Sequence, residues 1–137
     1  MWPHELFSLI WRHYPTAWER RMCPSPAKLA SFWDSQKNNP QMQHPDLLAK
    51  SDLQSRCIPL TIHGDGVGVA GKMRTWQKML DVWSWSSVLG EGTVLERTMY
   101  ITSWFHAAVC KADGHNSYDW IARKLKWSFD ALFDAET

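Results

Sequence analysis

The sequence predicts an α+β domain, and three observations support that fold class. Apolar residues make up 45% of the 137-residue chain and aromatic residues 13%, which is enough to form a packed core. Helical spacing dominates the first sixty residues, whereas later segments alternate with the period of two that is typical of strands. A last amphipathic segment returns to helical spacing. We therefore predict a helical N-terminal segment over 1–56 and a β-β-β-α domain over 57–137.

The N-terminal helices are predicted from prolines and apolar stripes. Pro3 suits the first turn of a helix, and the apolar residues that follow share one face until Pro15 stops or kinks the helix. Ser25 and Pro26 form an N-cap and first-turn pair for a second helix. A marginal helical turn is expected over 45–50.

Three strands are predicted next, and they form an antiparallel sheet over about 57–109. The first is a short apolar run that ends in a glycine-rich turn. The second and third alternate between two faces and are separated by a glycine turn. The predicted strands are 57–62, 82–89 and 99–109, with turns at 63–66 and 90–92.

The C-terminal helix is predicted over about 117–134. Asn116 or Ser117 can cap it after the turn at Asp113 and Gly114. Its core-facing stripe has helical spacing and contains Ile121, Leu125, Phe129 and Leu132.

Charge and cysteine content limit the classes of partner. Lys plus Arg total 15 against 14 Asp plus Glu, so the whole chain creates no strong field for nucleic acid or an anionic membrane. The sequence has neither a long apolar span nor a signal-peptide pattern, and we expect a nuclear or cytoplasmic protein with no membrane partner. Three widely spaced cysteines indicate neither a disulfide framework nor a zinc ribbon.

Asp65 is the main candidate for catalysis and metal binding. It follows an apolar strand and lies between two glycines, where a carboxylate is accessible to a ligand. Clustered carboxylates hold Mg²⁺ in phosphoryl transfer, and Asp81 is the preferred neighbour, with Glu91 and Asp113 as alternatives. The structural alternative is that Asp65 only supports a turn.

The segment from Gly66 to Lys72 has a second interpretation as a nucleotide-binding loop. Its glycines satisfy G-x-G-x-x-G, the dinucleotide-binding pattern, after a possible strand. The spacing from Gly66 to Lys72 also fits a phosphate-binding loop, but Met73 occupies the position of the Ser or Thr that holds magnesium there. The structural alternative is a glycine-rich hairpin.

Histidines offer a structural zinc site as a further alternative. His63 forms an H-x-D pair with Asp65, and His106, Cys110 and His115 follow later. His106 and Cys110 are four residues apart, which in a strand is about 13 Å, too far to share an ion, so this spacing argues against zinc.

Basic residues collect beside tryptophans, which favours nucleic-acid binding. Single-stranded or distorted nucleic acid is bound through phosphate contacts and stacking on aromatic rings. The alternative is an ordinary solvated helix face, because acidic residues dilute the positive charge. The candidate residues are Lys72, Arg74, Lys78, Arg123, Lys124 and Lys126.

Three segments resemble a group of mobile-element-like proteins from protist genomes. They are IPLTIHGDGVGVAGK, DVWSWSSVLGEGT and WIARKLKWSFDALFDAE, and the similarity covers about residues 57–136. If that group has an RNase H-like catalytic domain, the resemblance implies that Asp65 is the first acid of a DDE-type set. It then also implies a partial RNase H-like topology, cut after its first helix, that is inactive alone.

The leading hypothesis is therefore a truncated transposase- or integrase-like nucleic-acid-processing domain. The alternative is a non-catalytic Trp-rich module that binds nucleic acid, or binds a protein through an unpaired sheet edge. A nucleotide-binding domain that uses Gly66–Lys72 comes third.

Overall fold

The computed structural model describes residues 1–69, 78–105, 111–112 and 115–134. The chain forms two compact units, each built from separate stretches of sequence. This division differs from the predicted boundary at 56/57, because the first nine residues fold with most of the sheet and residues 86–97 fold with the N-terminal helices. Unit 1 consists of Met1–Leu9, Ile62–Trp85 and Thr98–Thr137, and unit 2 consists of Ile10–Thr61 and Ser86–Arg97.

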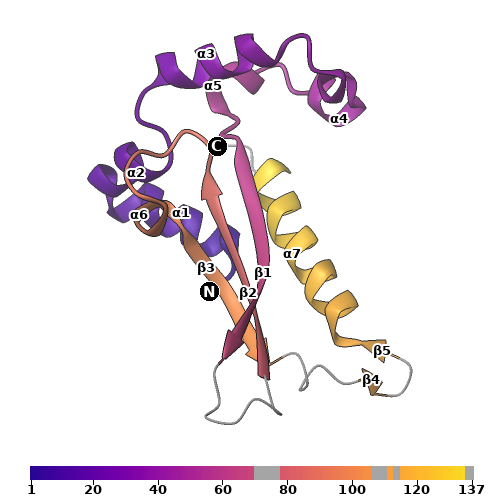
Figure 1. The fold of residues 1–137 in the computed structure, drawn as a ribbon. Helices are drawn as coiled ribbons and strands as arrows, with labels where there is room; N and C mark the ends of the chain where they lie inside the picture. Colours follow the sequence, from indigo (N-terminus) through magenta and orange to yellow (C-terminus); the bar gives the residue numbers. More distant parts are fainter. Residues whose placement is uncertain (70–77, 106–110, 113–114, 135–137) are drawn as a thin grey trace. The chain divides into compact units, whose positions relative to one another are not determined.

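A three-stranded sheet and a long helix form the framework of unit 1 (Figure 1). The strands lie in the order β1-β2-β3, and the helix α7 follows them in sequence. This confirms the α+β class, with N-terminal helices, a three-stranded antiparallel sheet and a C-terminal helix. The RNase H-like topology stays a prediction. The bounds are β1 (Leu60–Val69), β2 (Lys78–Ser87), β3 (Met99–Phe105) and α7 (Ser117–Asp134).

β1 corrects the prediction of a turn at 63–66, because the strand runs through the glycine-rich segment without interruption. A β-carbon at Gly64 would lie 2.9 Å from the ring of Trp83, so this glycine lets the indole lie against the strand. The sequence between Ile62 and Val69 has glycine at every second position, which is the side-chain period of a strand. The glycines were therefore misinterpreted as turn residues.

β2 and β3 pair antiparallel, with Asp81 opposite Trp104 and Trp85 opposite Met99. The register shifts between Trp83 and Ser84, and this irregularity interrupts the strict alternation that was predicted for the second strand. β2 begins four residues earlier than predicted, and β3 is described as far as Phe105.

Aromatic rings form the core of unit 1. Trp85 is 2% exposed, and its ring lies 6.5 Å from that of Phe7 and 6.3 Å from that of Phe129. These neighbours come from α1 (Pro3–His13) and α7, so one β2 side chain joins both helices to the sheet. α7 has the predicted bounds, and its stripe residue Leu125 is buried as expected. Two short strands, β4 (Lys111–Ala112) and β5 (His115–Asn116), pair before it.

Unit 2 contains short helices, several of which were not predicted. Pro15 was predicted to stop or kink the first helix, and α1 does end at His13. Pro15 also occupies the first turn of a further helix that was not predicted, where its missing N–H costs nothing. The predicted cap at Ser25 is confirmed, because its side chain accepts a hydrogen bond from the backbone N–H of Lys28. The elements are α2 (Pro15–Arg21), α3 (Pro26–Gln36), η1 (Pro40–Gln43), α4 (Pro45–Leu48), α5 (Leu53–Arg56) and α6 (Val94–Arg97).

Candidate functional site

Asp65 lies on β1 and is exposed. Its neighbour Gly64 faces the ring of Trp83, and successive side chains of a strand point to opposite faces. The Asp65 carboxylate therefore projects from the face of the sheet opposite to Trp83.

Asp81 lies on the same face of β2 as Trp83, two residues away. The hydroxyl of Tyr118, on the first turn of α7, donates a hydrogen bond to its carboxylate. The same bond raises the pKa of Tyr118, and the indole N–H of Trp104 opposes that shift. Asp81 thus connects the sheet to the start of α7.

The structure does not bring Asp65 and Asp81 together, because the two carboxylates project from opposite faces of the sheet. They do not fit a shared Mg²⁺ site in this arrangement. Of the alternatives, Glu91 pairs with Lys28 in unit 2, and Asp113 lies outside the described residues. Within the described ranges, no three His, Cys, Asp or Glu residues are grouped so that they could hold a metal ion.

The remaining loop and zinc candidates are only partly described. Gly66 and Gly68 lie within β1, not in the turn that the nucleotide-binding interpretation requires. Gly71 and Lys72 lie outside the described residues, as do His106 and Cys110 of the zinc alternative. His63 is exposed on β1.

Of the six basic candidates, three lie on one described helix. Arg123, Lys124 and Lys126 are exposed on α7, whereas Lys72 and Arg74 lie outside the described residues. Lys78 is the first residue of β2.

α7 separates a buried face from an exposed face that combines tryptophan with lysine. Trp120 is 58% exposed and Trp127 is 52% exposed, although large apolar rings are usually buried. The Lys124 ammonium lies over the Trp127 ring, 5.6 Å from its centroid. Residues four and seven apart lie on one side of a helix. We call Trp120, Lys124 and Trp127 the tryptophan–lysine face.

Two residues at the N-terminal end of the chain contact this face: Trp2, which precedes α1, and His4, which lies within it. Trp2 meets Trp120 edge to face with centroids 6.5 Å apart, and His4 meets Trp127 in the same way at 4.9 Å. His4 is anchored through its backbone N–H, which donates to Ser128 Oγ at 3.2 Å, and its Nδ1 lies 2.9 Å from the same oxygen. Ser128 is fully buried, so the anchor is shielded from water.

Lys126 differs from its two basic neighbours because it is paired with an acid. Its ammonium lies 2.6 Å from the Asp130 carboxylate, one turn further along the exposed surface of α7. This pairing offsets the Lys126 charge and leaves Lys124 beside the tryptophans as the cation with an aromatic partner.

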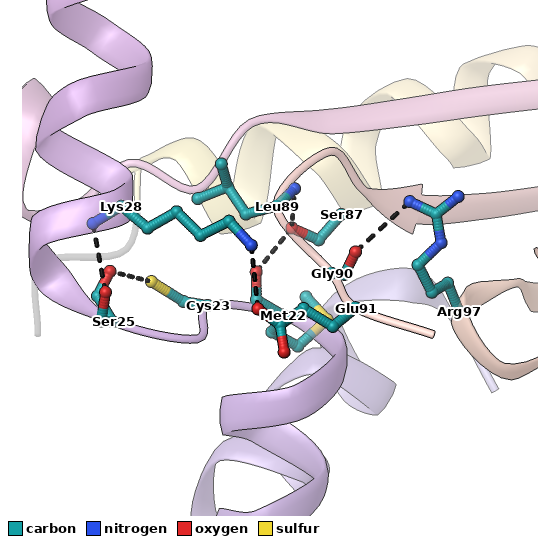
Figure 2. Close-up of polar contacts among 9 residues, drawn as sticks. All are labelled: Met22, Cys23, Ser25, Lys28, Ser87, Leu89, Gly90, Glu91 and Arg97. Carbon is teal, nitrogen blue, oxygen red and sulfur yellow. Dashed lines mark hydrogen bonds and ion pairs between the residues drawn. The ribbon is translucent and has the colours of Figure 1, made fainter. Parts of the chain in front are cut away.

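Unit 2 contains a polar network, which Figure 2 shows. Ser87 Oγ donates to the Met22 carbonyl at 2.5 Å and accepts from the Leu89 N–H at 3.1 Å. Lys28 binds Glu91 at 3.0 Å, and Arg97 donates to the Gly90 carbonyl at 3.3 Å. These bonds hold the connection after β2 against the residues that join α2 to α3.

The two described cysteines of unit 2 are free thiols with raised pKa values. Burial is the main cause for both Cys23 and Cys57, because a thiolate is poorly solvated there. A raised pKa lowers the thiolate fraction at neutral pH, so neither thiol is activated as a nucleophile. The bonds of Figure 2 hold the backbone around Met22 and around Leu89 in place.

Sequence reasoning missed Trp2, His4 and Tyr118 as parts of the sites. Trp2 and His4 lie more than one hundred positions from their α7 partners, and no local pattern connects them. Tyr118 directly follows the predicted cap position, and that prediction concerned only the start of the helix.

Comparisons with protein-family models, with curated proteins and with solved structures found no significant match to this chain. The resemblance to mobile-element-like proteins therefore stays a prediction. Among the described helices, none combines the length and the apolar character that a membrane crossing needs.

Proposed function

We propose that unit 1 is a non-catalytic nucleic-acid-binding module that uses the tryptophan–lysine face. The observation that carries the proposal is the Lys124 ammonium over the exposed ring of Trp127. Phosphates attract the cation, and bases can stack on the exposed indoles, so both parts of a nucleotide have a partner. Such a ligand would place the protein in the nucleus or the cytoplasm.

The local charge of α7 supports this choice. Arg123 lies next to Lys124, and both are exposed between the two tryptophans in sequence. Lys126, by contrast, is already paired with Asp130. A net charge of +1 for the whole chain means that binding depends on this local arrangement.

The first test measures binding of the full chain to a fluorescent nucleic acid over a range of salt concentrations. In Arg123→Gln with Lys124→Gln we expect weaker binding and a shallower dependence on salt. The slope should fall by about 0.7 for each lost contact to a single-stranded phosphate. Because the double variant removes two charges, Lys126→Gln is compared with Lys124→Gln, which also removes one charge from the same helix, and we expect nearly unchanged binding only in Lys126→Gln.

Two results would contradict the proposal. One is wild-type protein that binds no nucleic acid at low salt. The other is an equal loss of affinity in Lys126→Gln and in Lys124→Gln, since this would indicate a diffuse charge effect and no role for the tryptophan–lysine face.

A transposase- or integrase-like role is a second proposal, favoured by the order of the elements. Three consecutive strands in the order β1-β2-β3, followed by α7, match the arrangement that the resemblance implied. Its test is Mg²⁺ binding by the full chain, with Asp65→Asn as the variant, because the resemblance implies a domain that is inactive alone. Mg²⁺ binding that is unchanged in that variant would contradict the role assigned to Asp65.

A further inference from the structure

We propose that the tryptophan–lysine face is a base-stacking site for single strands, and that Trp2 and His4 hold its two indoles in position. This inference rests on the proposed function and adds the form of the ligand and two positioning residues. In duplex nucleic acid the base faces are covered by neighbouring bases, so an exposed indole can stack only on a base that is free of the duplex.

The order of side chains along α7 suits a single strand. Trp120 and Trp127 stand at the two ends of the site, and Arg123 and Lys124 lie between them. Seven residues of helix separate the indoles by about 10.5 Å along the axis. Stacked bases are about 3.4 Å apart, so the two rings are separated by roughly three nucleotide steps. Each terminal base can stack on one indole while the phosphates between them meet the cations.

Asp134 gives the site a limit at one end. It lies seven residues after Trp127 on the same side of the helix and is exposed, where its carboxylate repels phosphate. The favourable path therefore lies between the two tryptophans, because Asp119 is exposed beside Trp120 at the other end.

Lys124 has a resting position and a binding position in this scheme. Without a ligand its ammonium lies over Trp127, an exposed cation–π contact that is weak. A base that stacks on the indole displaces the ammonium, which then contacts the adjoining phosphate. The Lys124 ammonium therefore has a partner in both states, first the Trp127 ring and then a phosphate. The face of the ring is uncovered only when a base stacks on it.

The α1 contacts explain how exposed indoles keep a defined orientation. An edge-to-face neighbour restricts the rotation of a ring, and here each indole has one: Trp2 for Trp120 and His4 for Trp127. His4 is fixed in turn by the buried hydroxyl of Ser128. A preoriented ring loses less conformational entropy when a base binds.

The test compares the full chain for binding to a 12-nucleotide oligothymidylate and to a 12-base-pair duplex. We expect at least tenfold tighter binding to the single strand, with quenching of tryptophan fluorescence. Trp120→Leu and Trp127→Leu should each weaken single-strand binding by about tenfold and leave duplex binding unchanged, because each variant removes a ring on which an unpaired base stacks. Affinity should rise steeply with oligonucleotide length up to about four nucleotides and more slowly beyond.

Trp11→Leu is the matched control for the indole variants. Trp11 is 57% exposed, like the two α7 tryptophans, but it belongs to unit 2 and lies beside Trp18. Its loss should leave both affinities unchanged.

The positioning residues are tested by loss and rescue. Trp2→Leu and His4→Ala should weaken single-strand binding and reduce the fluorescence quenching, whereas Trp2→Phe and His4→Phe restore an aromatic edge and should recover most of both. Urea midpoints of all variants identify any that are simply unfolded. Recovery that is absent in both aromatic variants would overturn the positioning role.

The outcomes separate this inference from the proposed function. Equal affinity for single strand and duplex, or tryptophan variants that lose both equally, would overturn the inference while nucleic-acid binding stands. Binding of neither ligand would overturn the proposed function itself.

Discussion

Unit 1 has a cluster of ring contacts around Trp85, whereas unit 2 combines buried apolar side chains such as Met22 and Leu29 with a buried hydrogen bond from a side chain to the backbone. In unit 1, Trp85 contacts rings from two helices at once. In unit 2, Ser87 bridges the Met22 carbonyl and the Leu89 N–H with one hydroxyl. Ring packing tolerates an approximate fit, but a buried hydroxyl stabilises only when its partners are in place. The two units should therefore respond differently to substitution.

The same contrast applies to the exposed surface. In unit 1, the Lys124 ammonium lies over the exposed ring of Trp127. In the region of unit 2 that Figure 2 shows, Lys28 binds Glu91 and Arg97 binds the Gly90 carbonyl. Charges that are already engaged within the fold attract a polyanion less strongly. This difference is why the proposed binding face belongs to unit 1.

The largest expected effect is the loss of the Trp85 ring. Trp85→Ala should lower the free energy of unfolding by about 3–5 kcal/mol, because it removes a buried aromatic side chain and leaves a cavity. Urea denaturation followed by circular dichroism measures the change. Trp85→Phe keeps a ring between Phe7 and Phe129 and should cost clearly less. Equal losses in the two variants would mean that the indole N–H, and not ring packing, stabilises unit 1.

Ser87→Ala tests unit 2 and should have a smaller effect. The variant removes few atoms but leaves a backbone carbonyl and an N–H without their partner, so we expect a loss of about 1–3 kcal/mol in the free energy of unfolding. Ser86→Ala is the matched control, because its hydroxyl contacts the exposed Thr61 side chain. Equal losses in the free energy of unfolding for the two alanine variants would contradict the comparison between the units, because burial of the Ser87 hydroxyl would then have no effect.

Secondary structure could be predicted from the sequence wherever one local signal dominated. The bounds of α7 followed from its apolar stripe, and the Ser25 cap followed from its Ser-Pro pair. The turn predicted at 63–66 failed because glycine favours turns but also lets a large ring approach a strand, as Trp83 does at Gly64. Pairing of distant residues decides between those two roles, and a single sequence does not contain that information.

α6 shows a local signal that was present and overlooked. Thr93 and Glu96 have the spacing of a capping box, and each side chain bonds the backbone N–H of the other. The candidate binding site divides in the same way. Arg123 and Lys124 were identified from charge next to tryptophan, but Trp2 and His4 became part of the site only through tertiary contacts.

The capping box also predicts a pH effect, the smallest of the three. The bonds from the Thr93 backbone N–H and hydroxyl, together with the nearby Arg20 guanidinium, lower the pKa of Glu96 from its ordinary value of 4.5. A carboxyl with a depressed pKa in the folded state stabilises the fold above its unfolded pKa, and that contribution disappears as pH falls through the folded pKa.

Glu96→Gln should therefore lower the urea midpoint slightly at pH 7, and the difference from wild type should shrink as pH falls below about 4.5. Thr93→Ala is the companion variant, because it removes the hydroxyl bond and should weaken the same pH dependence. Midpoints measured at several pH values between 7 and 3 give the result. A difference that stays constant over this range would show that the Glu96 charge does not stabilise unit 2, and that its polar contacts act without the help of ionisation.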